Sequence, residues 1–199
     1  MGLYDAMYRV GYTPWEHPGE AWMSQLAQRL DTEEAERAKP LGRALDLGCG
    51  RGQYAPELVR RGWEVVGIDY APRAIAEARR QGIEGATYMV GDVSDLPVDR
   101  LGTFDFFFDV GCFQHFDAGQ RVGAGRGITA LANPGATLLM MAFSRSTPIG
   151  SFVKGVSPDD VQAAFPGWNL LSVDDADTGG MDFPMRRMQP KWMRLRQGS

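Results

Sequence analysis

The sequence predicts an α/β fold, in which a doubly wound, mostly parallel sheet of seven strands carries helices on both faces. Three observations indicate this fold class. Apolar runs of strand length alternate with helical patterns from Arg43 onward, as in consecutive βαβ units. The glycine-rich stretch Asp46–Gly52 joins the first of these strands to the next helix. The run Phe104–Asp109 has an uninterrupted apolar core, which favours a strand that is buried on both faces.

Residues 1–40 are expected to form an N-terminal helical cover. A helix is predicted from about Gly19, because apolar side chains recur there at helical spacing, namely Trp22, Met23, Leu26 and Leu30. The stretch Thr32–Arg37 resembles a capping box that opens a second, short polar helix. The segment Lys39–Gly42 is expected to end that helix, since proline and glycine both break helices.

The remaining elements alternate along the chain. The predicted strands are Arg43–Leu47, Glu64–Asp69, Thr87–Val90, Phe104–Asp109, Ala136–Phe143, Trp168–Val173 and one within Lys191–Arg196. The predicted helices are Gln53–Arg61, Pro72–Gln81, Ala118–Leu131 and Ser157–Phe165. Gly62 and Gly82 follow the first two of these helices, where a left-handed residue commonly ends a helix. The third helix holds glycines that would each weaken it by up to ~1 kcal/mol, at Gly123, Gly125 and Gly127.

The glycine-rich stretch has the spacing D-x-G-x-G-x-G and is the most informative motif in the chain. Its glycines allow φ > 0 and a close approach of the backbone to a ligand. Asp69 ends the next apolar run, where an acidic side chain is well placed to bind ribose hydroxyls. In a dinucleotide fingerprint the spacing is G-x-G-x-x-G, whereas Gly52 comes one residue too early and Asp46 would repel a pyrophosphate. A carboxylate at Asp46 could hold an ammonium group, directly or through water, which favours S-adenosylmethionine.

The sequence resembles the class I S-adenosylmethionine-dependent methyltransferases, and this resemblance implies a Rossmann-like fold. It is carried, in the expected order, by Ala44–Gly52, Val65–Tyr70, Gly91–Val93, Phe104–Asp105 and Asn133–Ala136. The segment Phe104–His115 and the pair Pro14-Trp15 are similar to the small-molecule branch with the tellurite-resistance and thiopurine methyltransferases. Val110 stands in place of a frequent arginine and Gln114 in place of a frequent histidine, so the substrate cannot be carried over.

The resemblance also implies roles for individual residues. Asp69 would take the ribose hydroxyls, and Tyr70 could stack on the adenine, whose edge Asp92 and Val93 would meet. Gly48, Cys49 and Gly50 would pass beneath the amino-acid end, which Asp46 would support, while Asp109 and Gly111 would close the crevice. Trp15 is expected either to roof the site or to pack the N-terminal cover onto the rest of the fold.

Composition limits the classes of partner. The 199 residues, 44% hydrophobic and 23% charged, suggest one domain with a cofactor-binding core at 41–145 and the rest of the sheet at 146–199. A net charge of −4 argues against a dedicated nucleic-acid binder. A basic group near the C-terminus is interpreted as a solvated strand edge, and it consists of Arg186, Arg187, Lys191, Arg194 and Arg196.

No membrane or metal signal is present in the sequence. No apolar run approaches the ~20 residues of a membrane span, and no signal-peptide pattern opens the chain, so a soluble cytoplasmic protein is expected. Two cysteines, Cys49 and Cys112, and two histidines show no ligand spacing, so no metal is expected and the thiols should be reduced. The sequence leaves the oligomeric state open.

We therefore predict an S-adenosylmethionine-dependent methyltransferase that acts on a small-molecule thiol, chalcogen, halide or aromatic hydroxyl. His115 is the candidate catalytic residue because it lies past the fourth strand, where such folds bind substrate, although it could equally be a helix-entry residue. DNA amino-methyltransferases carry a proline motif after that strand, and the stretch Asp109–Cys112 holds no proline, which excludes that class. The alternatives are a nucleotide-dependent oxidoreductase and a cofactor-binding protein without turnover.

Overall fold

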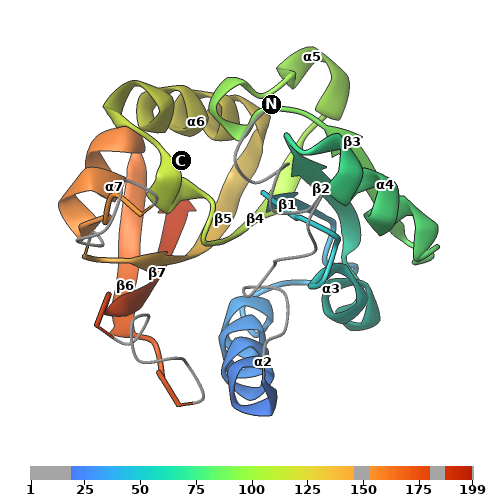
Figure 1. Cartoon of the computed structure of the whole chain (residues 1–199), viewed down its shortest axis with the longest axis horizontal. Helices are drawn as coiled ribbons and strands as arrows, with labels where there is room; N and C mark the ends of the chain where they lie inside the picture. The colour runs from blue at the N-terminus through green and yellow to red at the C-terminus, as the bar shows by residue number, and fades with distance from the viewer. Residues whose placement is uncertain (1–18, 146–152, 180–186, 199) are drawn as a thin grey trace.

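Seven strands form one sheet in the order β3-β2-β1-β4-β5-β7-β6 in the computed structural model, which describes residues 19–145, 153–179 and 187–198 (Figure 1). The strands are β1 (Arg43–Leu47), β2 (Glu64–Asp69), β3 (Ala86–Val90), β4 (Phe104–Val110), β5 (Ala132–Phe143), β6 (Trp168–Asp175) and β7 (Pro190–Gln197). β1 to β5 pair in parallel, whereas β7 runs antiparallel to both β5 and β6. The predicted seven-stranded, mostly parallel sheet is confirmed.

Helices connect most of the strands. In the described part of the chain they are α2 (Glu20–Glu34), α3 (Ala55–Arg61), α4 (Pro72–Arg80), α5 (Val98–Leu101), α6 (Ala118–Leu131) and α7 (Pro158–Ala164), with 3₁₀ turns η1 (Val93–Asp95) and η2 (Phe113–His115). Gly62 ends α3 with a φ of 104°, as predicted. None of the helices in the described ranges has the length and apolarity that crossing a membrane requires.

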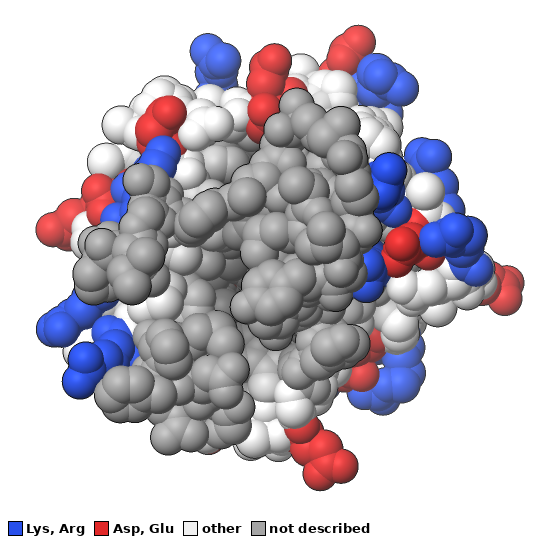
Figure 2. Space-filling view, viewed as in Figure 1, with Lys and Arg blue, Asp and Glu red and all other residues white. Residues whose placement is uncertain are grey.

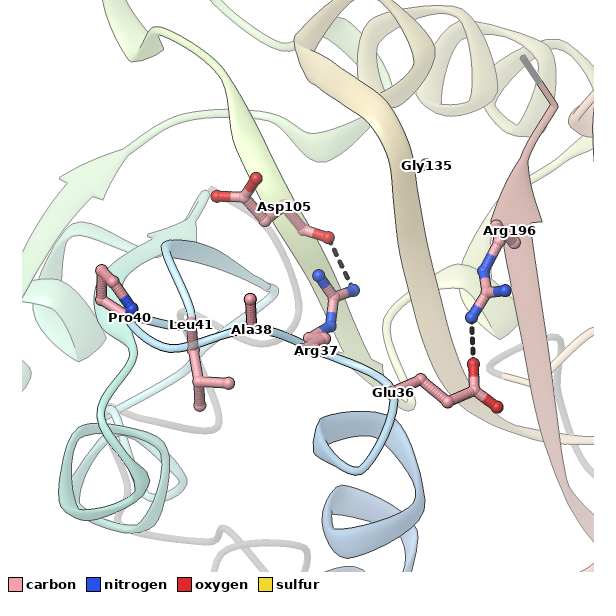
Figure 3. Close-up of a pocket in the computed structure, with 8 residues that line it drawn as sticks. All are labelled: Glu36, Arg37, Ala38, Pro40, Leu41, Asp105, Gly135 and Arg196. Carbon is pink, nitrogen blue, oxygen red and sulfur yellow. Dashed lines mark hydrogen bonds and ion pairs between the residues drawn. The ribbon is translucent and has the colours of Figure 1, made fainter.

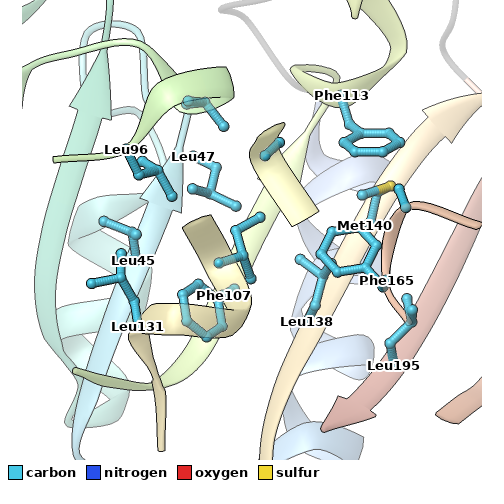
Figure 4. Close-up of a cluster of buried hydrophobic side chains, with 14 of the residues drawn as sticks. Leu45, Leu47, Leu96, Phe107, Phe113, Leu131, Leu138, Met140, Phe165 and Leu195 are labelled. Carbon is cyan, nitrogen blue, oxygen red and sulfur yellow. The ribbon is translucent and has the colours of Figure 1, made fainter. Parts of the chain in front are cut away.

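Helices cover both faces of the sheet, so the fold is doubly wound (Figure 1). On one face α5, α6 and α7 pack onto the strands through a core that includes Ile128 and Val161; Figure 4 shows part of this core. On the other face α2, α3 and α4 contribute to a second core, which includes Leu30 and Ile75. Burying one such side chain stabilises the fold by about 1.5–3 kcal/mol, so both layers hold the sheet in place.

β4 supplies aromatic side chains to both cores. Phe104 and Phe107 belong to the first core, and Phe106 and Phe108 belong to the second. Their alternation changes phase because the register with β5 shifts between Phe104 and Phe106. All of these rings are fully buried, which confirms the prediction that this strand is covered on both faces.

The prediction of a second polar helix from Thr32 is wrong, because α2 runs without a break through this position. The Thr32 hydroxyl donates to the carbonyl of Gln28 within the same helix. Glu33 is fully buried, where its carboxylate accepts hydrogen bonds from Arg37 and from Arg194 of β7. The residues that resemble a capping box therefore form the end of α2 and the segment directly after it, and they attach this helix to the sheet.

For the basic residues of β7, the interpretation as a solvated strand edge is wrong. β7 lies between β5 and β6, so it is an interior strand. Arg194 and Arg196 both pair with Glu36, which follows α2, and Lys191 pairs with Asp175 of β6. Figure 2 shows basic and acidic side chains interspersed around the rim of the molecule in this view. Arg186 lies outside the described residues.

α6 forms where it was predicted despite its glycines. A Cβ on Gly125 would lie 1.8 Å from the carbonyl oxygen of Ala164, and one on Gly123 would lie 2.3 Å from that of Ser94. Real atoms cannot approach this closely, so a side chain at either position would push α6 away from its neighbours. The glycines therefore cost helix propensity and allow close packing of α6 against α7 and η1.

Candidate functional site

The loops that follow β1, β2, β3 and β4 meet at one edge of the sheet, because these strands are parallel and adjacent. From β1 the chain builds outward to β3 and then crosses to β4 on the other side of β1. Open α/β sheets bind ligands at such a reversal point, outside the carboxyl ends of the strands. Every predicted site residue lies at this edge, except Trp15, which is outside the described residues.

The glycine loop, residues Gly48–Gly52, adopts a backbone that other residues disfavour. Gly48, Gly50 and Gly52 have φ values of 71°, 54° and 77°. A Cβ on Gly48 would lie 2.7 Å from the Cβ of Cys112, so the loop packs closely on the segment after β4. The backbone N–H groups of Gly48 and Cys49 both donate to the carbonyl of Ile68 in β2. The loop is thus held between the ends of β2 and β4.

The carboxylate of Asp69 lies at the end of β2 and joins two loops. Its Oδ2 accepts a hydrogen bond of 3.0 Å from the N–H of Gly50, and its Oδ1 accepts one of 2.8 Å from the N–H of Ala71. The side chain is buried, with 8% of its surface exposed. Asp69 therefore sets the distance between the glycine loop and the start of α4.

Asp46 is a buried acidic side chain at this edge with an oxygen that is unpartnered within the described ranges. It is buried, and its Oδ2 has no hydrogen-bond partner among the residues that the structure describes. Burial, with the carboxylates of Asp109 and Asp69 nearby, raises the pKa of Asp46 to about 8. A buried acceptor without a donor is costly, so a donor or a positive charge next to this oxygen would be stabilising.

Asp109 ends the apolar part of β4 and holds the turn that follows. Its carboxylate accepts hydrogen bonds from the N–H groups of Cys112 (2.9 Å) and Phe113 (3.1 Å). Burial raises its pKa to about 7, and the backbone donors oppose that rise. Gly111, with a φ of 86°, allows the chain to turn here. These two predicted site residues therefore shape the loop beside the crevice.

The two cysteines lie on facing loops as free thiols. Cys49 is buried in the glycine loop and Cys112 is partly buried after β4. Burial, together with nearby carboxylates, raises the pKa of both thiols. Neither thiol is suited to act as a nucleophile, because the thiolate is the reactive form. In the described ranges no group of three or more acidic, histidine or cysteine side chains is arranged to hold a metal ion.

The residues after β2 and β3 differ in what they can present to a ligand. Tyr70 follows β2 and is 44% exposed, so its ring offers an accessible face. Asp92 is exposed and caps η1, because its Oδ1 accepts hydrogen bonds from the N–H and the hydroxyl of Ser94. The Val93 side chain packs in the first core, so only its backbone faces the loop region.

His115 lies in η2 and is partly buried. Its backbone N–H donates to the carbonyl of Cys112, which places it one turn beyond the end of β4. The neighbouring Gln114 is buried, and its Oε1 accepts a hydrogen bond of 2.8 Å from the N–H of Phe143 at the end of β5. The Gln114 carbonyl accepts another from the N–H of Lys154. Gln114 thereby fixes the turn that carries His115.

One residue at this edge has no signal in the motif pattern. Tyr88 of β3 is buried, and its hydroxyl has no hydrogen-bond partner within the described part of the chain. Burial, with Cys49 and Asp46 nearby, raises its pKa to about 12. In the sequence this tyrosine is an ordinary strand residue, and only the fold brings its hydroxyl beneath the glycine loop.

A separate open hollow of about 420 Å³ lies at the opposite edge of the sheet, before β1 (Figure 3). Figure 3 shows Arg37 bonded to the backbone of Asp105, and Arg196 paired with Glu36. Arg37, Glu36 and Arg196 beside this hollow are thus already bonded, and their bonds attach the segment that follows α2 to the sheet. The hollow is distant from the carboxyl ends of the strands, so we assign the candidate site to the glycine loop.

Comparison with known proteins shows which proteins this chain resembles. Residues 44–135 match the family described as a methyltransferase domain. Ubiquinone biosynthesis O-methyltransferase of Xanthomonas campestris pv. campestris is 32% identical over 121 residues, which are 59% of this chain and 50% of that protein. The 2-heptyl-1-hydroxyquinolin-4(1H)-one methyltransferase of Mycobacteroides abscessus is 32% identical over 115 residues, which are 56% of this chain and 50% of that protein. The chain spans about half the length of these curated relatives.

A solved structure extends the likeness to the whole fold. N-methyltransferase NodS of Bradyrhizobium japonicum, in complex with S-adenosyl-L-homocysteine, has a TM-score of 0.79 to this chain at 16% identity. The match covers 98% of each chain. The predicted Rossmann-like fold is therefore confirmed, and within it residues 44–135 match the methyltransferase-domain family.

Proposed function

We propose that this protein, whose residues 44–135 match a methyltransferase domain, is an S-adenosylmethionine-dependent methyltransferase that acts on a hydroxyl group of a small aromatic molecule. The observation that carries the proposal is the glycine loop over the buried, unpartnered Oδ2 of Asp46. The names of the two curated relatives refer to O-methylation and to a hydroxylated quinolinone. Those names favour an aromatic hydroxyl over a thiol, chalcogen or halide acceptor.

The residues at the carboxyl edge fit an S-adenosyl ligand. An ammonium group would satisfy the orphan acceptor of Asp46 and would favour its ionised form. The exposed ring of Tyr70 provides a surface on which adenine can stack. Asp69, which already fixes the loop geometry, provides the carboxylate for ribose hydroxyls. Gly48 and Gly50 bring the backbone close to the ligand without a side chain in the way.

When bound, the cofactor supplies a methyl group that is activated by the positive charge on its sulfur. The chain must then hold the acceptor oxygen in line with that methyl group, and such positioning contributes up to ~7–11 kcal/mol. We assign His115 the role of accepting the proton of the acceptor hydroxyl, because it lies in the 3₁₀ turn that follows β4. Asp109 and Gln114 hold the backbone of this turn and so keep His115 in position.

Ligand titration and a transfer assay test the proposal. We expect S-adenosylhomocysteine to bind in isothermal calorimetry and to raise the melting temperature, and NAD to do neither. We also expect methyl transfer from S-adenosylmethionine to phenols and hydroxyquinolinones in a screen that includes thiols, halides and tellurite. Binding of NAD without binding of S-adenosylhomocysteine would favour the oxidoreductase alternative. Binding without transfer to any acceptor would favour a protein without turnover.

The role of His115 is tested by its effect on the pH profile. For the variant His115→Gln we expect kcat to fall about 100-fold or more at neutral pH, since general-base catalysis contributes ~10²–10⁴-fold. The loss should shrink as pH rises toward the pKa of the acceptor hydroxyl, because an ionised acceptor needs no base. A uniform loss at every pH would show that His115 acts by packing. Unchanged affinity for S-adenosylhomocysteine is the control for an intact cofactor site.

A further inference from the structure

Two buried polar atoms without partners lie in one row across the sheet. Asp46 of β1 pairs in register with Gly67 of β2, and Gly67 pairs with Tyr88 of β3. Cross-strand partners present their side chains on the same face of a sheet. On the other side of Asp46 the row continues to Phe108, and both Phe108 and Tyr88 pack in the second core. Asp46 and Tyr88 therefore face the same layer, between the sheet and α3.

The lack of a side chain at Gly67 lets the side chains of Tyr88 and Cys49 pack over this position of β2. A Cβ on Gly67 would lie 2.7 Å from the Tyr88 ring and 2.8 Å from the Sγ of Cys49. The ring of Tyr88 thus lies across the strand at the position where a side chain would stand. Its hydroxyl reaches the underside of the glycine loop, since a Cβ on Gly52 would lie 2.7 Å from that oxygen.

Two other polar groups on this side of the sheet are already bonded. The Sγ of Cys49 lies 3.7 Å from the carbonyl of Gly50. The hydroxyl of Tyr54 accepts a hydrogen bond from the indole of Trp22. The Oδ2 of Asp46 and the hydroxyl of Tyr88 do not bond to each other, and neither has another partner in the described ranges. Buried polar groups are rarely left without partners, and an ordered water commonly supplies what the protein lacks.

We propose that Asp46 and Tyr88 hold one buried water beneath the glycine loop, and that this water is part of the binding site for the ammonium end of the S-adenosyl ligand. The donors and acceptors match. When the bound ammonium favours the ionised form of Asp46, the tyrosine hydroxyl can donate to the water, and the water can donate to the carboxylate, which then only accepts. The water then keeps one lone pair for an N–H of the ammonium. This inference rests on the proposed function and adds Tyr88 to the cofactor site.

The test removes the hydroxyl and compares two ligands. Tyr88→Phe keeps the ring that fills the space over Gly67 and deletes only the oxygen. S-adenosylhomocysteine carries the ammonium group, whereas 5′-methylthioadenosine lacks the whole amino-acid end. We expect Tyr88→Phe to weaken the binding of S-adenosylhomocysteine about fivefold to tenfold in calorimetry, as for the loss of one hydrogen bond between uncharged groups. Binding of 5′-methylthioadenosine should stay unchanged.

A matched control and a second variant make the test specific to the hydroxyl of Tyr88. Tyr54→Phe also removes a hydroxyl on this face and should leave the ratio of the two affinities as in the unmodified protein. Tyr88→Met removes the hydroxyl with a flexible apolar side chain and should repeat the selective loss even where Tyr88→Phe folds poorly. In the double variant Asp46→Asn, Tyr88→Phe, the second change should have little further effect, because both residues act through one water.

The outcomes separate this inference from the proposed function. Equal affinity of Tyr88→Phe and the unmodified protein for S-adenosylhomocysteine would overturn the shared water. An equal loss for both ligands would overturn it as well, because the hydroxyl would then serve the adenosine end or the fold. If the unmodified protein fails to bind S-adenosylhomocysteine at all, the proposed function itself fails.

Discussion

The carboxylate of Asp69 accepts a hydrogen bond of 3.0 Å from the backbone N–H of Gly50, which ties the end of β2 to the glycine loop after β1. The same carboxylate accepts a second hydrogen bond from the N–H of Ala71, at the start of α4. One side chain thus sets the relative positions of two loops that would flank a bound nucleoside. The residue proposed to contact the ribose is also the residue that shapes the crevice.

Replacing this carboxylate should therefore weaken ligand binding. For Asp69→Ala we expect the dissociation constant of S-adenosylhomocysteine to rise ~10–100-fold, because hydrogen bonds to a charged group contribute ~1.5–3 kcal/mol. Calorimetry on the folded variant measures this change. The exposed Asp99 of α5 provides the control, and Asp99→Asn should bind as the unmodified protein does. An unchanged dissociation constant for Asp69→Ala would remove Asp69 from the ribose site.

The free energy of unfolding should decrease as pH rises, because burial favours the neutral form of two carboxyl groups, Asp46 and Asp109. The pKa of Asp46 is about 8 in the folded protein, against a model-compound value of 3.8 for the unfolded chain. Between these values the folded state binds more protons, so the free energy of unfolding falls as pH rises. The contribution of neutral Asp46 to the free energy of unfolding is fully present below pH ~4 and is lost as pH rises through ~8. Asp109, with a pKa of about 7, acts in the same direction.

The melting temperature of the ligand-free protein should therefore fall between pH 5 and pH 8. Carboxyls with a lowered pKa, such as Glu57, titrate below this window and do not oppose the trend. Asp46→Asn should show a smaller decrease, because the buried group no longer ionises, while Asp99→Asn should follow the unmodified protein. Identical slopes for Asp46→Asn and the unmodified protein would contradict the ionisation of Asp46 in this range.

Adding a methyl group to α6 should be destabilising at one glycine and harmless at another. Alanine normally improves a helix interior by up to ~1 kcal/mol over glycine. A Cβ at Gly125 would lie 1.8 Å from the Ala164 carbonyl, and overpacking of this kind costs about 1–3 kcal/mol. Gly119, in the first turn of the same helix, is the matched control, since its Cβ would make only an ordinary contact of 3.4 Å. Urea unfolding should show a loss for Gly125→Ala and none for Gly119→Ala.

The buried Glu33 should be one of the most sensitive positions for stability. Its carboxylate is fully buried and pairs with Arg37 and Arg194 at 2.6 and 2.7 Å. Removing one partner of a buried ionic group leaves the others uncompensated, so Glu33→Gln should lower the free energy of unfolding by about 3 kcal/mol. Urea denaturation measures the loss, with the exposed Glu84→Gln as control. A loss below that of the control would show that Glu33 does not anchor α2.

Much of the fold and of the candidate site follows from local sequence pattern. The strands β1 and β2 have the predicted bounds, because apolar runs between glycine and proline signals leave few alternatives. The spacing of glycines is sufficient to predict the glycine loop, since glycine adopts the backbone seen at Gly48, Gly50 and Gly52 more readily than other residues do. Asp69 follows from its place at the end of the next strand. These features are local, so neighbouring residues are sufficient to specify them.

Tertiary structure alone decided which distant groups meet. The sequence pattern predicts Glu33 in a polar helix. In the structure Glu33 is buried against the sheet, where its partner Arg194 lies 161 positions away in the chain. β7 reads as an edge, but it inserts between β5 and β6. The row of Asp46, Gly67 and Tyr88 exists only because three strands stand in register. Strand order and register depend on contacts between residues far apart along the chain, and no local pattern encodes them.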